Sequence, residues 1–147
     1  MQNHKKLNKE LPSGNTHSVL ETHDLHSATI EIWDNGIYYV HFLPESEVGI
    51  ELARKAFQLL KEKHQNTPMY IMIEMGKYTV LTKEAREFAY SEEGLSLNRV
   101  SAIVVHSIAQ RLMVNLMAEL KSNHAIKVKA FKNHEEAEEW LLNQKNA

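Results

Sequence analysis

The chain has 147 residues, 43% of them hydrophobic, and a formal net charge of −2, which suits one domain with its own buried core. It contains no cysteine, so disulfides and thiolate metal sites are excluded, and a cytoplasmic location fits. The lack of basic excess argues against nucleic-acid binding, and no apolar run reaches the roughly 18 residues of a membrane span.

The first 27 residues are polar, with Pro12-Ser13-Gly14-Asn15 in the middle. This composition predicts a flexible N-terminal arm, or an arm that adds a short edge element to a sheet. The residues after Met1 lack the apolar region of a secretory signal. We therefore expect one folded domain over residues 28–147.

The domain is expected to open with a β-hairpin. Residues 29–33 alternate between apolar and polar side chains, residues 37–43 are β-rich, and Asn35-Gly36 between them is a strong hairpin signal. An apolar stripe at helical spacing then predicts a helix that starts at Ser46 or Glu47.

Three strand–helix units follow. Each helix is preceded by a capping residue, which accepts a hydrogen bond from the first turn. The expected strands cover residues 69–75, 100–106 and 126–131, and the expected helices begin after Thr82, Ser107 and Asn133, the first of them ending at Gly94.

The resulting order, ββαβαβαβα, predicts an α/β fold with a single mixed, mostly parallel sheet of about five strands and flanking helices. Three stretches carry a family resemblance: "TKEAREFA", "AIVVHSIAQRLMVNLM" and "VKAFKNHEEAEEWL". With this order of elements, the chain from roughly residue 28 to 142 resembles the SpoIIAA-like fold of STAS domains and small bacterial STAS/SEC14-like proteins. The resemblance implies a STAS-like interaction or regulatory module, or a SEC14-like binder of a small ligand or lipid.

STAS regulators carry an Asp-Ser-Ser/Thr-Gly-type motif after the third strand, where a partner kinase phosphorylates a hydroxyl. This sequence has Glu74-Met75-Gly76-Lys77-Tyr78-Thr79 there, so the resemblance does not carry the phosphorylation site over. Thr79 and Thr82 are nearby hydroxyls. We take Glu74, Gly76, Lys77, Tyr78, Thr79 and Thr82 as a candidate binding or regulatory loop.

Ligands of open α/β sheets bind beyond the carboxyl ends of the strands. His106 and Ser107 follow the fourth strand and open a helix, so they are candidates for a small-anion site. The alternative is that Ser107 only caps the helix and His106 only ends the strand. Thr82 likewise has a simpler role as a cap.

The third helix is unusually rich in large apolar residues. Ile108, Leu112, Leu116 and Leu120 form one row, which is enough to cover a sheet, while Ala109, Met113 and Met117 form a second row. Met113 and Met117 are therefore candidates for an apolar interface with a partner, a second copy or a ligand. The alternative is one broad core stripe.

No catalytic constellation is visible, since the sequence lacks a nucleophile-elbow or metalloprotease motif. The only tight histidine cluster, His23-Asp24-Leu25-His26, lies in the polar N-terminal segment and matches no metal-binding motif. We therefore predict no metal and no cofactor. The first hypothesis is a non-enzymatic interaction module that docks a protein or a second copy. The alternative is a binder of a small apolar ligand, with a pocket of several hundred Å³ walled by the third helix. An enzyme using Glu74, Lys77, Tyr78 and His106 has the least support.

Overall fold

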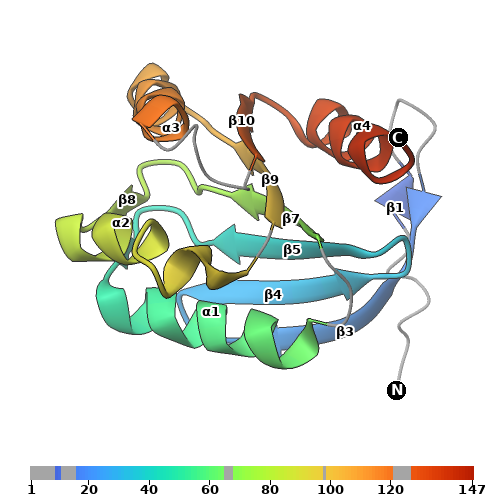
Figure 1. Ribbon diagram of the computed structural model, residues 1–147, viewed down its shortest axis with the longest axis horizontal. Coiled ribbons are helices and arrows are strands. Elements are labelled where there is room, and N and C mark those ends of the chain that lie inside the picture. The colour runs from blue at the N-terminus through green and yellow to red at the C-terminus, as the bar shows by residue number, and fades with distance from the viewer. Residues whose placement is uncertain (1–8, 11–15, 65–67, 98, 121–126) are drawn as a thin grey trace.

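The computed structural model describes residues 9–10, 16–64, 68–97, 99–120 and 127–147, and the statements below concern these residues. The predicted alternation of strands and helices is present, and the main sheet gains one further strand ahead of the hairpin (Figure 1). The strands are β1 (Lys9–Glu10), β2 (Thr16–His17), β3 (Val19–Asp24), β4 (Ala28–Trp33), β5 (Ile37–Phe42), β6 (Glu47–Val48), β7 (Met69–Glu74), β8 (Val80–Leu81), β9 (Arg99–Val104) and β10 (Lys127–Phe131). The helices are α1 (Ile50–Lys63), α2 (Lys83–Ala89), α3 (Ile108–Leu120) and α4 (His134–Lys145), and Gly94–Ser96 forms a 3₁₀ turn.

The main sheet has six strands in the order β10-β9-β7-β5-β4-β3. The four strands from β10 to β5 are parallel, and β4 and β3 are antiparallel to their neighbours. This confirms the predicted mixed, mostly parallel sheet. The additional strand is β3, at the edge of the sheet. The second half of the N-terminal arm therefore adds an edge strand, which is one of the two alternatives that its composition predicts.

The hairpin between β4 and β5 forms where Asn35-Gly36 predicts it. Gly36 has a φ of +91°, a conformation that costs other residues steric strain, and its N–H bonds to the carbonyl of Trp33 at 3.0 Å. The hairpin places the two strands in antiparallel register, with Ile30 opposite Val40.

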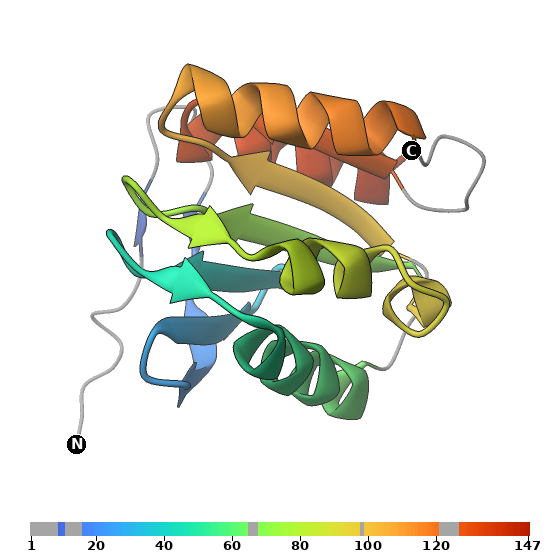
Figure 2. The same ribbon diagram turned by 90° about the vertical axis from the view of Figure 1, so that its left-hand side faces the viewer.

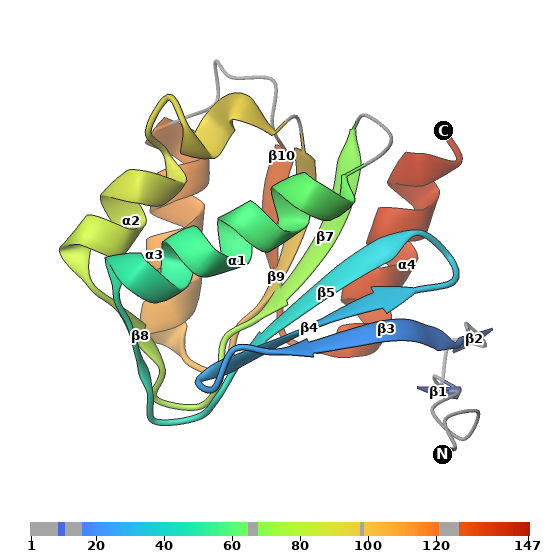
Figure 3. The ribbon, with the colours of Figure 1, turned by 90° about the horizontal axis from the view of Figure 1, so that it is seen from below.

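Helices cover both faces of the sheet, with α1, α2 and α3 on one face and α4 on the other (Figure 3). Strand residues alternate between these faces. On β5, for example, Val40 and Phe42 join the core beneath α1, whereas Ile37 and Tyr39 join the core beneath α4. The alternation decides which face each functional side chain reaches.

The three predicted caps are present. Thr82 Oγ1 accepts a hydrogen bond from the N–H of Ala85, and Asn133 Oδ1 accepts one from the N–H of Glu136. Ser107 Oγ accepts a hydrogen bond from the N–H of Gln110 at 3.0 Å. These bonds satisfy N–H groups that the first turn of a helix leaves free.

Two helix boundaries differ from the prediction. Residues 47–48 do not begin α1 but form β6, which pairs with β8 and runs beside it into the helices (Figure 2). The pairing holds this segment extended, so α1 starts at Ile50. Helix α2 ends at Ala89, ahead of Gly94, which instead opens the 3₁₀ turn.

The segment ahead of β3 is anchored by a buried histidine. His17 stacks on Trp33 with ring centroids 3.5 Å apart, and its Nδ1 lies 3.1 Å from Oε2 of Glu138 on α4. Both polar residues are buried, and Asn35 donates a further hydrogen bond to Glu138 at 3.0 Å. Residue 17 is therefore part of the folded domain. No helix in the described part of the chain is long and apolar enough to cross a bilayer.

Candidate functional site

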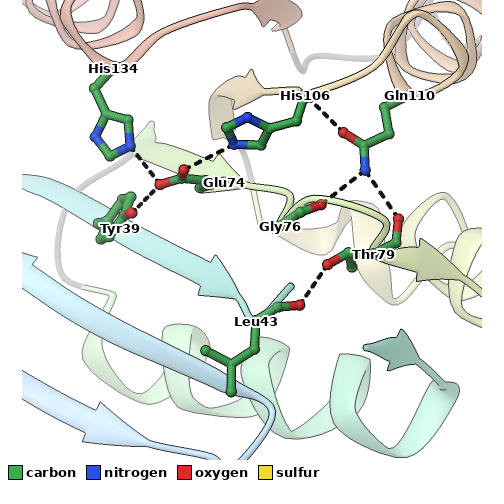
Figure 4. Close-up of polar contacts among 8 residues, drawn as sticks. All are labelled: Tyr39, Leu43, Glu74, Gly76, Thr79, His106, Gln110 and His134. Atoms are coloured by element: carbon green, nitrogen blue, oxygen red, sulfur yellow. Dashed lines mark hydrogen bonds and ion pairs between the residues drawn. The ribbon is translucent and has the colours of Figure 1, made fainter. Parts of the chain in front are cut away.

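Glu74, the last residue of β7, lies at the centre of a polar cluster on the face of the sheet that α4 covers (Figure 4). Its Oε2 lies 3.1 Å from Nε2 of His106, and its Oε1 lies 2.5 Å from Nε2 of His134. Oε1 also accepts a hydrogen bond from the hydroxyl of Tyr39 on β5. Strand alternation explains why Glu74 reaches these side chains. Glu74 lies on the same face of the sheet as Met72, which belongs to the core beneath α4.

The cluster keeps Glu74 ionised. Burial opposes this, but hydrogen bonds from His134 and Tyr39, supported by His106, outweigh it and lower the pKa of Glu74 to about 2. Burial, and then the contact with Glu74, raises the pKa of Tyr39 well above its ordinary range. A proton-transfer catalyst works best with a pKa near the operating pH. These pKa values instead suit a fixed anchor that ties the starts of α3 and α4 to the sheet.

The candidate loop after β7 is held by one buried glutamine. Gln110 Nε2 donates to the carbonyls of Gly76 and Thr79, each at 3.1 Å, and its Oε1 accepts from the N–H of His106 at 2.8 Å (Figure 4). Thr79 is 2% exposed and donates its hydroxyl to the carbonyl of Leu43 at 2.6 Å. The Thr79 hydroxyl is thus engaged in the fold and shielded from a kinase.

The remaining members of the candidate loop divide between the surface and the backbone. Lys77 and Tyr78 are exposed, and the ammonium of Lys77 lies 5.4 Å from the centre of the Tyr78 ring. Gly76 packs so closely on the main chain of residues 42–44 that a Cβ at Gly76 would lie 2.6 Å from the nitrogen of Pro44. The sequence brought these residues to one loop, but their side chains do not converge on one site.

The candidate anion site has a basic border, and none of the described residues that line it has a buried side-chain donor. Ser107 serves as the cap of α3, and His106 is bonded to Glu74. A shallow depression beside them is bordered by Arg111 and Lys132. The capping alternative accounts for Ser107.

An apolar cavity of about 160 Å³ lies between the sheet and helices α1, α2 and α3. Helix α3 contributes Met113, Val114 and Met117 to its wall. Met113 and Met117 keep partial exposure, as do Ala89 and Tyr90 of the lining, so the cavity reaches solvent between α2 and α3. Its position is the one that the ligand-binding hypothesis predicts. Its volume is smaller than that hypothesis expects, since ordinary ligand pockets measure roughly 300–1,000 Å³.

Two polar residues in the cavity wall were not recognised in the sequence. Arg99 and Ser101 lie on the same face of β9, and both line the cavity. Arg99 donates to the carbonyls of Gly94 at 3.0 Å and Ala89 at 3.4 Å. Ser101 is 1% exposed, and its hydroxyl has no hydrogen-bond partner among the described residues. The available signal was a charged and a hydroxyl residue at alternate positions of an otherwise apolar strand.

The two apolar rows of α3 do not take the expected roles. The row of Ile108, Leu112 and Leu116, expected to cover the sheet, faces solvent with exposures of 78%, 62% and 56%. Val114 is buried, and Met113 and Met117 line the cavity. The exposed apolar surface is therefore on the other row from the two methionines. Composition could not reveal this, because both rows consist of apolar residues.

Among the residues that the structure describes, no group of three or more histidine, aspartate or glutamate side chains is arranged to hold a metal ion. In the histidine cluster of the N-terminal segment, His23 bonds to Glu21 at 2.9 Å, and Asp24 accepts from the N–H of His26 at 2.8 Å.

Comparison with known proteins identifies the fold. A crystal structure of a DUF3478-family protein with a SpoIIAA-like fold, from Shewanella loihica PV-4, is similar to this chain with a TM-score of 0.51 and 16% sequence identity. The similarity covers 86% of this chain and 96% of that one, which confirms the predicted SpoIIAA-like fold. No curated protein sequence matches the chain significantly. The model of one family, described as a domain of unknown function (DUF7793), matches residues 30–145, and the chain therefore belongs to that family.

Proposed function

We propose that the protein is a binding domain for a small apolar ligand. The observation that carries this proposal is the cavity of about 160 Å³, whose wall is almost entirely carbon. Apolar cavities of about 150 Å³ in other proteins stay dry and take up benzene, so the volume suits roughly six ligand carbons. The proposal favours binding over catalysis, since Glu74, the strongest acid–base candidate, is held as a fully engaged anion.

The volume also narrows the ligand class. A phospholipid or long-chain fatty acid needs several times this space, so the SEC14-like idea is kept only in a reduced form, as a site for a compact molecule. The burial of six carbons at about 0.8 kcal/mol each gives about 5 kcal/mol, which corresponds to a Kd of roughly 0.2 mM. A natural ligand with matching polar groups would bind more tightly.

Filling the cavity tests the proposal. Ala89 is the last residue of α2 and lines the cavity, so Ala89→Leu places three further carbons in or beside it. Ala109→Leu is a matched control, because Ala109 is exposed on α3. Benzyl alcohol titrated into isotopically labelled protein should shift amide NMR signals around Met113 in wild type and A109L, but not in A89L. Equal shifts in all three proteins, or none in wild type, would refute ligand binding at this site.

A second candidate function is self-association through the exposed row of α3, which keeps the interaction-module hypothesis in a specific form. Ile108, Leu112 and Leu116 form an i, i+4 ridge suited to packing against the same ridge of a second copy. The flanking charges support this occupant. Arg111 lies near the start of α3 and Glu119 near its end, so an antiparallel copy brings opposite charges towards each other.

The oligomeric state tests this candidate. Sedimentation of wild type over a range of concentrations should give a dimer, and Leu112→Glu should give a monomer, since a charge in the centre of an apolar interface is costly. Leu20→Glu is the control, because Leu20 is 65% exposed on β3, away from α3. A wild-type monomer at all concentrations, or a dimer that survives L112E, would exclude the ridge as the interface.

A further inference from the structure

We infer that the cavity takes a compact ligand that carries a carboxylate, with Arg99 and Ser101 as the partners of that head group. This inference rests on the proposed ligand-binding function and adds the chemical class of the ligand. It is carried by two polar side chains in the apolar wall of the cavity, one a cation and the other a buried hydroxyl.

Arg99 is a half-buried cation with no carboxylate partner among the described residues. Its two described hydrogen bonds go to the main-chain carbonyls of Ala89 and Gly94, which carry no net charge. A guanidinium has five N–H donors, so donors remain after these two bonds. A cation withdrawn from water is costly unless an anion pairs with it. A carboxylate in the cavity would supply that charge and could accept two parallel hydrogen bonds.

Ser101 provides the second, independent observation. Its hydroxyl is buried, has no hydrogen-bond partner in the described structure, and belongs to the cavity wall. A buried hydroxyl without a partner costs about 1–3 kcal/mol, which a ligand acceptor would recover. Arg99 and Ser101 lie two positions apart along β9, roughly 7 Å, which one ligand head group and its first carbons can span. Both groups therefore point to a ligand that is polar at one end.

The rest of the cavity decides what the other end must be. Beyond Ser101 the same strand face continues with Ile103, and α3 faces it with Met113 and Val114. Among the described residues that line the cavity, Arg99 is the only one with a charged side chain. A carboxylate on an aromatic ring or on a short branched chain matches this arrangement: an acid head beside Arg99 and about six carbons against the aliphatic wall.

A simpler explanation is that Arg99 only caps the carbonyls at the end of α2, as cations often do at helix C-termini. In that case the cavity should not distinguish a charged from a neutral ligand. Benzoate and benzyl alcohol make this distinction, because they share the ring and differ in the charge of the head group.

The experiment is an NMR titration of the full chain with benzoate and, separately, benzyl alcohol at pH 7. Wild type should bind benzoate at least tenfold more tightly than benzyl alcohol. Arg99→Met should weaken benzoate about tenfold or more and change benzyl alcohol less than threefold, and Ser101→Ala should weaken benzoate severalfold. Arg86→Met is the control, because Arg86 also donates to a main-chain carbonyl, that of Leu81 at 2.7 Å, but does not line the cavity.

The outcomes separate this inference from the function on which it rests. If neither compound binds wild type, the ligand-binding function fails and the inference fails with it. If both bind equally, the function stands and a carboxylate-specific site is refuted, whether or not R99M folds. If benzoate is preferred but S101A and R99M bind it like R86M, the preference arises elsewhere and the assignment to β9 is wrong.

Discussion

Replacing Glu74 with glutamine tests whether the polar cluster anchors α3 and α4 to the sheet. The carboxylate forms hydrogen bonds with Tyr39, His106 and His134. Burial alone would raise its pKa, but these hydrogen bonds outweigh burial and lower the pKa from 4.5 to about 2. At about 1.36 kcal/mol per unit of pKa, the folded state gains about 3 kcal/mol from this one group. The amide of Glu74→Gln can keep only part of the network, so we expect a loss of about 2–3 kcal/mol at pH 7.

The sign of the pH dependence follows from the lowered pKa. The contribution of Glu74 is fully present above pH 4.5 and is lost as the pH falls from 4.5 towards 2. Between pH 7 and pH 3, wild type should therefore lose about 2 kcal/mol that the E74Q variant does not lose. Urea unfolding followed by tryptophan fluorescence at both pH values measures this difference, because all other carboxylates are common to the two proteins.

Glu139→Gln is the control for E74Q, since Glu139 is exposed on α4. It should change the free energy of unfolding by less than about 0.5 kcal/mol. If E74Q is as stable as E139Q at pH 7, and its stability falls in parallel with wild type down to pH 3, then the cluster does not stabilise the fold and the anchor role is refuted.

Three further substitutions test how the loop after β7 is held. Gly76→Ala would place a Cβ 2.6 Å from the nitrogen of Pro44, so the main chain must move, and thermal unfolding should occur several degrees lower; an unchanged Tm would contradict the close packing. Gln110→Leu removes the donor to two carbonyls of the loop, so urea unfolding should show a loss of about 2–4 kcal/mol, together with faster amide exchange in the loop; unchanged exchange would show that the glutamine is dispensable. Thr82→Ala removes the cap of α2 and should cost about 1 kcal/mol in the same assay, whereas Thr82→Ser should cost little; equal losses in the two variants would argue against capping.

Signals that depend on a few neighbouring residues predicted the fold well. The Asn35-Gly36 turn and the caps at Thr82, Ser107 and Asn133 each act within about four residues, and each is present. The start of α1 was wrong for a non-local reason, since β6 pairs with β8 more than 30 residues away. The strand β3 is harder to predict for a different reason, because an edge strand with little burial has no strong apolar alternation of its own.

The candidate site was predictable only in part. Because ligands of open α/β sheets bind beyond the carboxyl ends of the strands, Glu74 and His106 were expected to lie close together, and they form a hydrogen bond. The rule could not supply Tyr39 or His134, because their approach depends on which face of β5 each residue takes and on where α4 docks. Glu138 shows the same limit. It looks like one of several exposed acids of the last helix, yet it is buried against His17 from the opposite end of the chain.

Helix α3 connects the two proposals, because they use opposite sides of it. Met113 and Val114 wall the cavity, whereas Leu112, one residue earlier, is 62% exposed. A successive residue on a helix turns by about 100°, so a substitution at Leu112 leaves the cavity wall in place, and Ala89→Leu on α2 leaves the exposed ridge in place. If benzoate binding weakens in L112E while its stability is unchanged, the two sides are coupled through the packing of α3, and a ligand in the cavity should then also alter self-association. If L112E binds benzoate as wild type does, the cavity and the ridge act as independent sites on one helix.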